Sequence, residues 1–471
     1  MPQPVEAEPP ARTTEILVAA GFGRADAARL AAVPPPRLGD LVSDWEHVRR
    51  WLELSGELLR RLPPKPQRSP EAQAAAEQLL TGARGVRERF ARRHAGAIYR
   101  QLTAGMTRLL RLRELVFAAA AGFPGLVPTP AQLAREREFL QMHQDGVQID
   151  QGILLAHVFA DREAGLHLLH AMGQPTRWAL DRLEEFRATG RLHLEPMSLE
   201  RDGELGRITF HHQAWLNAED DEYQQALETL VDLVLLDDRI RVGVLRGAPM
   251  EKAKYAGRRV FGAGINLTLL YRGQISLVDF MLTRETGPLA KIYRGLAGPE
   301  YAPPSIEDRV EKPFIGAVDA FAVGGHCQML LVLDWVIAER GAYFNLPARK
   351  EGIIPGVANL RLPRFVGERA TRQAIFFNRA FPADSPEGRL ICDEVLEGSQ
   401  IDAAVSTAAA ELTAAGTTSL VANRRALRVG AEPLDLFRSY LATYAREQAY
   451  CLYSPALIDN LVRNWNANQR R

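Results

Sequence analysis

A strand, a helix and a second strand follow one another in the middle of the chain, and this order constrains the fold more than any other feature of the sequence. Residues 206–210 are a short β-type run, residues 219–236 have helical periodicity, and residues 239–246, which read RIRVGVLR, form the second strand. Such a βαβ unit favours a parallel sheet flanked by helices. Further strand-like runs at 313–318 and 335–339 extend the prediction, so the expected fold class is α/β.

The regions on either side of this α/β core are helical in composition. Towards the N-terminus Ala, Leu, Arg and Glu dominate, and apolar residues recur at helical spacing. Proline-rich breaks at 34–36, 63–64 and 124–130 separate these helices. The expected domains are a loosely held lead-in at 1–12, a helical N-terminal domain at 13–194, a core at 195–402 and a helical C-terminal region at 403–471.

Composition and charge narrow the class of partner. Charged residues make up 24% of the 471 residues and the formal net charge is +1, which does not suggest a nucleic-acid-binding surface. Cys327, Cys392 and Cys451 are far apart and form no CxxC pair, so a disulfide scaffold or a cysteine-rich zinc site is not expected. No apolar run approaches the length of a membrane span. We expect a cytoplasmic protein with neither nucleic acid nor a membrane as its partner.

Two glycine-bearing turns carry most of the chemical information. Residues 260–267 read VFGAGINL and residues 321–328 read FAVGGHCQ, each after a strand-like run. Glycine lets the backbone approach a ligand closely, and a Gly-Gly pair at a helix N-terminus leaves N–H groups without partners. Two such groups that converge on one oxygen make an oxyanion hole. Taken alone, each segment is more often an ordinary tight turn, but the pair, in this order, is more specific.

Both turns resemble motifs of the crotonase superfamily. Residues 261–266, FGAGIN, are similar to its F-x-A-G-x-D segment, and residues 312–318 with 322–325 are similar to its K-P-x-I-A-A-V…A-x-G-G segment. Residues 346–347 with 352–356 resemble its later x-P-E…G-x-x-P-G stretch. The resemblance covers the core and implies a crotonase-like ββα spiral that binds an acyl-coenzyme A thioester.

The same resemblance assigns residues to an oxyanion hole and its surroundings. It implies that the backbone N–H groups of Ile265 and Gly325 donate to the thioester oxygen as the thioester becomes an enolate. Substrate contacts are expected from the other residues of the first turn, which are Ala263, Gly264, Asn266 and Leu267.

Two departures from the superfamily pattern argue against a hydratase. Hydratase-type members use two glutamates to add water across a double bond, and the matching positions here are Gln328 and Ala348. Neither side chain can serve as a carboxylate acid or base. The enolate-stabilising frame is therefore expected without the water-adding groups.

With the long helical N-terminal region, these departures resemble one branch, the 3,5-dihydroxyphenylacetyl-CoA 1,2-dioxygenases of glycopeptide-antibiotic biosynthesis. The resemblance implies a reaction with O2 that needs no metal or organic cofactor and releases 3,5-dihydroxyphenylglyoxylate and CoA. It matches that family's substrate-contacting Glu, Arg and Gln to Glu219, Arg284 and Gln328. From the residues alone, each has another interpretation. Glu219 could favour a helix dipole beside a capping box, Arg284 could pair with Glu285 or Asp279 at the surface, and Gln328 could be a satisfied buried amide.

The implied mechanism passes through an enolate that is delocalised into an aromatic ring and a carbonyl. The enolate passes one electron to O2, and the resulting peroxide attacks the thioester carbon and expels CoA. Leu267, Ile353 and Ile354 are candidates for an apolar oxygen pocket, or else ordinary core residues. Lys252, in a basic stretch before the first turn, is a candidate for contact with CoA, or else part of a solvated loop.

Three competing functions share some of these features. A crotonase-fold thioesterase or isomerase would use the same oxyanion hole on an aryl-acyl-CoA. The HxE spacing of His193 and Glu195 is that of a metal-dependent dioxygenase, which also needs a distant second histidine and a β-barrel frame. A non-enzymatic scaffold could be built on the helical region. By resemblance to crotonases, we expect a homo-oligomer, either a trimer or a hexamer.

Overall fold

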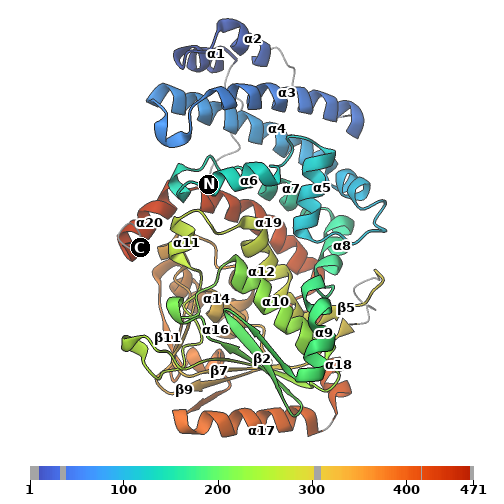
Figure 1. The fold of residues 1–471 in the computed structure, drawn as a ribbon, viewed down its shortest axis with the longest axis vertical. Coiled ribbons are helices and arrows are strands. Elements are labelled where there is room, and N and C mark those ends of the chain that lie inside the picture. Colours follow the sequence, from blue (N-terminus) through green and yellow to red (C-terminus); the bar gives the residue numbers. More distant parts are fainter. Residues whose placement is uncertain (1–9, 32–38, 302–308, 415, 467–471) are drawn as a thin grey trace. The chain divides into compact units, whose positions relative to one another are not determined.

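The computed structural model describes residues 10–31, 39–301, 309–414 and 416–466 (Figure 1). The chain forms two compact units. The first comprises Met1–Leu168, Arg272–Gln274 and Leu441–Tyr453, and the second comprises Leu169–Tyr271, Ile275–Tyr440 and Ser454–Arg471. Of the expected lead-in at 1–12, residues 1–9 lie outside the described residues, and the first helix begins at Pro10.

The first unit is built of helices, as its composition predicts. The two longest begin at side-chain caps: Asp40 accepts the N–H of Ser43, and Ser69 accepts the N–H of Ala72, which satisfies N–H groups that a helix start leaves free. The predicted break at 63–64 separates α3 from α4, whereas the one at 34–36 lies outside the described residues. The elements are α1 (Pro10–Ala19), α2 (Arg24–Ala31), α3 (Leu41–Arg61), η1 (Lys65–Gln67), α4 (Pro70–Leu102), α5 (Leu112–Gly122), α6 (Pro130–Glu136), η2 (Gln141–His143), α7 (Gln148–Ala160), most of α8 (Arg162–Met172) and the end of α19 (Leu434–Leu452).

A seven-stranded sheet organises the second unit, in the order β1-β2-β3-β4-β7-β9-β12. Its strands are β1 (Arg191–Leu194), β2 (Met197–Asp202), β3 (Leu205–Phe210), β4 (Val242–Gly247), β7 (Phe314–Val318), β9 (Trp335–Glu339) and β12 (Glu394–Leu396). From β3 to β12 all neighbours are parallel, whereas β1 and β2 add an antiparallel edge. The strands β3 and β4 are joined by α10 (Asp221–Leu236), which confirms the predicted βαβ unit.

Two small sheets and several short helices surround this sheet. The sheets are β8 (Phe321–Val323) with β10 (Tyr343–Asn345) and β11 (Phe381–Pro382), and β5 (Leu296–Ala297) with β6 (Arg309–Val310). The remaining helices are α9 (Arg177–Thr189), η3 (Gln213–Trp215), η4 (Ala253–Tyr255), α11 (Leu267–Tyr271), the π-helix η5 (Leu277–Leu282), α12 (Thr283–Thr286), α13 (Pro288–Arg294), α14 (Gly325–Leu330), α15 (Ala348–Glu351), α16 (Ala358–Phe377), η6 (Gly388–Leu390), η7 (Gly398–Gln400), α17 (Ile401–Ala414), α18 (Thr417–Ala431) and α20 (Pro455–Trp465).

Apolar side chains cover both faces of the large sheet. Helix α17 lies along one face of the sheet (Figure 1), and its Ile401 and Val405 pack in one cluster with Ile315 and Ile337. On the other, Leu230 of α10 belongs to the main core cluster. Burying such a side chain contributes roughly 1.5–3 kcal/mol, so strands covered on both sides read as nearly continuous apolar runs. This burial explains why the central strands were predictable.

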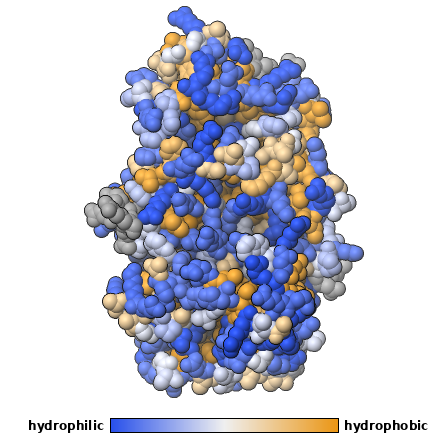
Figure 2. Space-filling view, viewed as in Figure 1, coloured by the Kyte–Doolittle hydropathy of each residue, from blue (hydrophilic) through white to orange (hydrophobic). Residues whose placement is uncertain are grey.

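The surface is mainly polar on the face drawn in Figure 2, where smaller apolar areas lie between hydrophilic side chains. This pattern is ordinary, because polar surface is insufficient to cover a folded protein completely. Among the described helices, none combines the length and the apolar composition that crossing a bilayer requires.

Candidate active site

The two glycine-bearing turns lie side by side in the second unit. Gly262 pairs with Ala322 in a parallel bridge, and the N–H of Val323 donates to the Gly262 carbonyl at 3.0 Å. Gly264 and Gly324 have φ angles of +81° and +56°, a region that glycine enters without steric cost. A Cβ atom on Gly324 would lie 3.1 Å from the Gly264 Cα. The two backbones can therefore approach this closely only as glycines.

The N–H groups of Ile265 and Gly325 both lie at this contact. A Cβ on Gly324 would be 3.9 Å from the Ile265 nitrogen, and a Cβ on Gly264 would be 3.4 Å from the Gly325 nitrogen. Ile265 pairs with Glu219 through the backbone groups on either side of it, so its own N–H faces away. Gly325 opens α14, where an N–H has no helical partner. Neither N–H has an acceptor within the described part of the chain, so both are available as donors at this contact.

Arg284 is the centre of a buried polar cluster beside these turns. Its Nε donates to Glu219 Oε2 at 2.8 Å and its Nη2 to Glu219 Oε1 at 3.3 Å. Its Nη1 donates to Glu285 Oε1 at 2.6 Å and to Gln328 Oε1 at 3.1 Å, and Nη2 also donates to the Gly325 carbonyl. A guanidinium has five N–H groups, and these acceptors engage all of them. The cluster brings together Glu219, Arg284 and Gln328, the three residues that the sequence grouped.

The burial and the charges of the cluster decide between the interpretations left open by the sequence. Arg284 is 4% exposed and Glu219 is 1% exposed, so Arg284 is not a surface residue, although Glu285 is indeed one partner. Burial opposes its charged form, but the two carboxylates outweigh burial and hold the pKa of Arg284 above its ordinary value. The N-cap of α10 is Asp220, which accepts the N–H of Tyr223 at 3.0 Å. Glu219 therefore does not cap α10, and its carboxylate pairs with Arg284.

His326, which the sequence analysis did not select, supports the first turn from behind. Its Nδ1 accepts the N–H of Gly264 at 3.3 Å, so the proton is on Nε2, which lies 2.9 Å from the Tyr223 hydroxyl. A Cβ on Gly262 would overlap the imidazole ring. Burial lowers the pKa of His326 to about 4, and the ring is neutral at physiological pH. Its place directly after the Gly-Gly pair was the available sequence signal.

The loop after α15 covers the cluster from another side. A Cβ on Gly356 would overlap the carboxyl oxygen Oε1 of Glu285 and the amide oxygen of Gln328. The loop also carries Ile353 and Ile354, which are half-buried. It therefore brings the candidate oxygen-pocket residues into the same part of the fold as the Arg284 cluster.

The remaining predicted residues are more dispersed. Asn266 is buried, with Oδ1 accepting the N–H of Leu269 at 3.2 Å and Nδ2 lacking a partner among the described residues. Ala263 and Leu267 are half-buried on the same turn. Lys252 is exposed at the start of η4, and no hydrogen bond or ion pair among the described residues joins it to the cluster. The structure does not bring it together with the others.

The metal-site alternative rested on His193. Its ring stacks on that of His211, with centroids 4.7 Å apart and planes 3° apart. Stacked rings direct their nitrogen lone pairs side by side, whereas ligands of one ion must converge on it. In the described ranges, no group of three or more His, Cys, Asp or Glu side chains is arranged to hold a metal ion.

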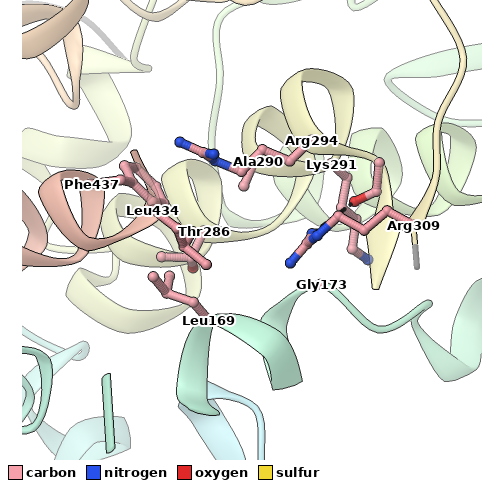
Figure 3. A pocket seen from close by; sticks show the side chains of 10 residues that line it. Leu169, Gly173, Thr286, Ala290, Lys291, Arg294, Arg309, Leu434 and Phe437 are labelled. Carbon is pink, nitrogen blue, oxygen red and sulfur yellow. Dashed lines mark hydrogen bonds between the residues drawn. The ribbon is translucent and has the colours of Figure 1, made fainter. Parts of the chain in front are cut away.

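A separate small pocket lies between α13, β6 and α19 (Figure 3). Lys291, Arg294 and Arg309 line it together with apolar side chains such as Phe437. Lys291 is held by buried acids, at 2.8 Å from Glu228 and 2.7 Å from Asp232. None of the predicted site residues lines this pocket.

Comparison with known proteins identifies the family. The sequence model of the enoyl-CoA hydratase/isomerase family matches residues 306–444. The (3,5-dihydroxyphenyl)acetyl-CoA 1,2-dioxygenase of Amycolatopsis orientalis is 47% identical over 85% of this chain and 91% of its own length. The chain belongs to this dioxygenase family, within the crotonase superfamily.

More distant relatives match about half of the chain. A probable enoyl-CoA hydratase of Rhizobium meliloti is 28% identical over 55% of this chain and 95% of its own length. An enoyl-CoA hydratase of known structure from Bacillus halodurans is 18% identical, covers 56% of this chain and 98% of its own, and superposes with a TM-score of 0.48.

In this crotonase-superfamily chain, the two positions matched to hydratase glutamates hold groups that cannot transfer a proton as a carboxylate does. Gln328 is buried against Arg284, and Ala348 opens α15. An amide and a methyl group leave the site with hydrogen-bond donors and no carboxylic acid at these positions.

Proposed function

We propose that the chain is a (3,5-dihydroxyphenyl)acetyl-CoA 1,2-dioxygenase that converts its thioester and O2 to 3,5-dihydroxyphenylglyoxylate and CoA. The observation that carries this proposal is the 47% identity to a dioxygenase of that activity over 91% of the relative's length. The unpaired N–H groups beside the Arg284 cluster support it, because the reaction begins with a carbonyl that becomes an enolate.

The proposed chemistry starts at the α-carbon of the arylacetyl group. Loss of an α-proton gives a carbanion delocalised into the ring and the thioester carbonyl, and the N–H groups of Ile265 and Gly325 stabilise the charge on the carbonyl oxygen. The enolate passes one electron to O2, and the two radicals combine to a peroxide at the α-carbon. The peroxide attacks the thioester carbon, and CoA leaves as its thiolate. The remaining α-hydrogen is then lost as a proton, and its C–H electron pair forms the ketone C=O as the O–O bond breaks. One oxygen atom of O2 ends in the ketone and the other in the carboxylate.

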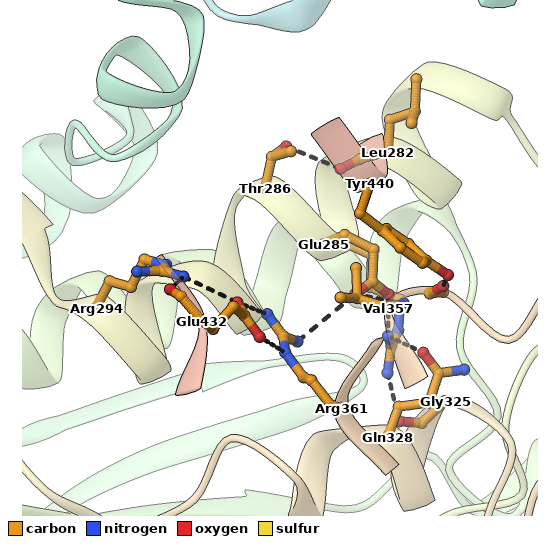
Figure 4. Close-up of polar contacts among 12 residues, drawn as sticks. Leu282, Glu285, Thr286, Arg294, Gly325, Gln328, Val357, Arg361, Glu432 and Tyr440 are labelled. Atoms are coloured by element: carbon orange, nitrogen blue, oxygen red, sulfur yellow. Dashed lines mark hydrogen bonds and ion pairs between the residues drawn. The ribbon is translucent and has the colours of Figure 1, made fainter. Parts of the chain in front are cut away.

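Gln328 is proposed to donate to the substrate. Its Oε1 faces Arg284, so its Nε2 points away from the guanidinium (Figure 4) and is the donor left for a thioester or peroxide oxygen. Glu219 and Arg284 are proposed to orient the ring hydroxyls. Every N–H of Arg284 already has an acceptor in the protein. A ring hydroxyl of the substrate can therefore bind in one of two ways: it accepts from Arg284 and displaces a protein oxygen, or it donates to Glu219.

The proposal includes no metal and no organic cofactor; O2 is the co-substrate and CoA is part of the substrate. Leu267, Ile353 and Ile354 are proposed to form the apolar wall beside the α-carbon, and Lys252 to meet the CoA moiety. The assembly is proposed to be a homotrimer or hexamer.

The decisive test is incubation of the purified protein with (3,5-dihydroxyphenyl)acetyl-CoA in the presence and absence of O2. We expect CoA release only with O2, and mass spectrometry under 18O2 should find two labelled oxygens in the product. Unchanged activity after chelation, in protein free of metal by elemental analysis, is expected for the cofactor-independent reaction. CoA release without O2 and without label would instead indicate a thioesterase, and a rearranged thioester an isomerase.

A further inference from the structure

Glu285 is a buried carboxylate that the proposed chemistry does not use, and the sequence suggested it only as a surface partner of Arg284. It follows Arg284 on α12, directly after the π-helix η5, a distortion that is frequent at functional sites. It is 1% exposed. A carboxylate buried this deeply requires donors on both oxygens, and its partners therefore show what it holds in place.

The two oxygens of Glu285 face different parts of the site. Oε1 accepts from Arg284 Nη1 at 2.6 Å, and Oε2 accepts the N–H of Val357 at 3.3 Å. Oε1 also lies against the Cα of Gly356, whose carbonyl accepts from the Tyr440 hydroxyl at 2.5 Å. Glu285 therefore joins the guanidinium of the cluster to the loop that carries the proposed oxygen wall.

A second buried charge pair stands behind Glu285. Arg361 Nη1 is 3.9 Å from Glu285 Oε2, and Arg361 is anchored by Glu432 through bonds of 2.9 and 3.0 Å. Glu432 also binds Arg294 at 2.9 Å. Figure 4 shows Arg361 between Glu432 and Glu285. Burial opposes the ionised form of Glu432, but Arg361 and the other arginines outweigh it and lower its pKa to about 2. Glu432 is therefore ionised at physiological pH and keeps its ion pair with Arg361.

Arg284 holds two residues, Gly325 and Gln328, that the proposed mechanism places next to the reacting atoms. Arg284 binds the carbonyl of Gly325 and the amide oxygen of Gln328. Holding that carbonyl limits rotation of the residue whose N–H is the proposed oxyanion donor, and holding Oε1 aims Gln328 Nε2. A shift of about 1 Å in such groups can lower a rate about 100-fold.

We propose that Glu285 is a positioning residue, which holds Arg284 and the Gly356–Val357 backbone in a fixed arrangement. In that arrangement the N–H of Gly325 and the Nε2 of Gln328 can both donate to the same substrate molecule. Arg361 and Glu432 hold Glu285 in turn. This inference rests on the enolate chemistry of the proposed function, and it adds a residue that touches no reacting atom.

The substitution that tests the role is Glu285→Gln. Glutamine has the shape of glutamate but one acceptor and one NH2 group. One of the two sides, Arg284 or Val357, would then meet a donor instead of an acceptor. Glu285→Asp keeps both acceptors on a shorter arm and serves as the conservative variant. Glu311→Gln is the matched control, because Glu311 is also a buried carboxylate bound by arginines, at 2.7 Å from Arg428, and contacts none of the site residues.

The readout is anaerobic exchange of the substrate's α-hydrogens with D2O, which reports enolate formation without any oxygen chemistry. We expect exchange by the Glu285→Gln protein to be about 100-fold slower than wild type, the Glu285→Asp protein to recover part of the rate, and the Glu311→Gln protein to stay within about twofold. Melting temperatures of all variants, measured in parallel, show whether each is folded at the assay temperature.

Two results would overturn the inference. One is exchange by the Glu285→Gln protein within about twofold of wild type. The other is a loss in the Glu311→Gln protein as large as that in the Glu285→Gln protein, which would mean that any damaged buried ion pair has this effect. Absence of exchange in the wild type would overturn the enolate role and this inference with it. Exchange without incorporation of 18O2 would overturn only the proposed oxygenation.

Discussion

The carboxylate of Glu219 lies directly against the Cα of Gly325. A Cβ atom at position 325 would overlap Glu219 Oε2 and stand 2.7 Å from its Cδ and 2.9 Å from Arg284 Nη2. The glycine is therefore needed for the side chains packed beside it as well as for the turn that it belongs to. The proposed oxyanion donor and the Glu219–Arg284 pair form one packed unit.

Gly325→Ala tests this packing. The methyl group can be accommodated only if the carboxylate moves away or the turn opens, and either change displaces the Gly325 N–H. Loss of one oxyanion donor costs about 100- to 1000-fold in turnover, so we expect a drop of at least about 100-fold in CoA release. Gly341→Ala is the control, because a Cβ at Gly341 meets nothing within 4 Å and its φ is not positive. Equal activities of the two variants would contradict the prediction.

Arg284→Met tests the cluster through stability. Removing the guanidinium leaves Glu219 buried without its charge partner and Glu285 with only Arg361, at 3.9 Å. Breaking a buried pair in this way typically costs about 3–5 kcal/mol. We expect a loss of that size in the free energy of unfolding, measured in urea. The comparison is Arg340→Met, which removes a partner of Glu397 from a pair that is 54% and 63% exposed. Exposed pairs contribute little, so this variant should remain close to wild type.

The buried imidazole of His326 should make stability depend on pH in one direction. Its pKa is about 4 in the folded chain against an ordinary value of 6.5, so between these pH values the unfolded chain binds more protons. Stability from this group is present above pH 6.5 and is lost as the pH falls towards 4, by about 3 kcal/mol in all. We expect the difference in unfolding free energy between the wild type and His326→Gln to shrink over that window. A difference independent of pH would contradict the assignment.

The sequence was sufficient for those parts of the fold and site that depend on local pattern. Residues 335–339 were predicted as a strand with its observed bounds, because a strand buried on both faces is apolar throughout. The two turns were recognisable because only glycine permits their backbone contact. By contrast, β1 alternates between exposed and half-buried positions, and β2 has buried positions only in its first half. Their pairing depends on β3, which a local pattern does not reveal.

The charged cluster shows why the rest of the site could not be read in advance. Arg284 meets Glu219 from 65 positions away and Gln328 from 44 positions away, and Arg361 meets Glu432 from 71 positions away. Such pairings follow from where helices end in space, not from spacing along the chain. The family resemblance supplied Glu219, Arg284 and Gln328, and the sequence offered Glu285 only as a surface partner of Arg284. His326 emerged only once its partners were in place.

Lys291→Met is expected to destabilise the second unit without a direct effect on the site. Lys291 is 0% exposed and is the cation between Glu228 and Asp232, so its loss leaves two buried carboxylates that repel each other. Burial already raises the pKa of Asp232, and without the lysine this acid should bind a proton more readily when folded than when unfolded. The variant should therefore be about 3–5 kcal/mol less stable than wild type at pH 8, and this deficit should narrow as the pH falls.

The combined variant Lys291→Met, Glu228→Gln, Asp232→Asn should recover stability at pH 8, because it removes the uncompensated charges. Melting temperatures between pH 5 and pH 8 measure both effects, and a deficit that stayed constant with pH and survived in the combined variant would mean that packing, not charge, is what Lys291 supplies.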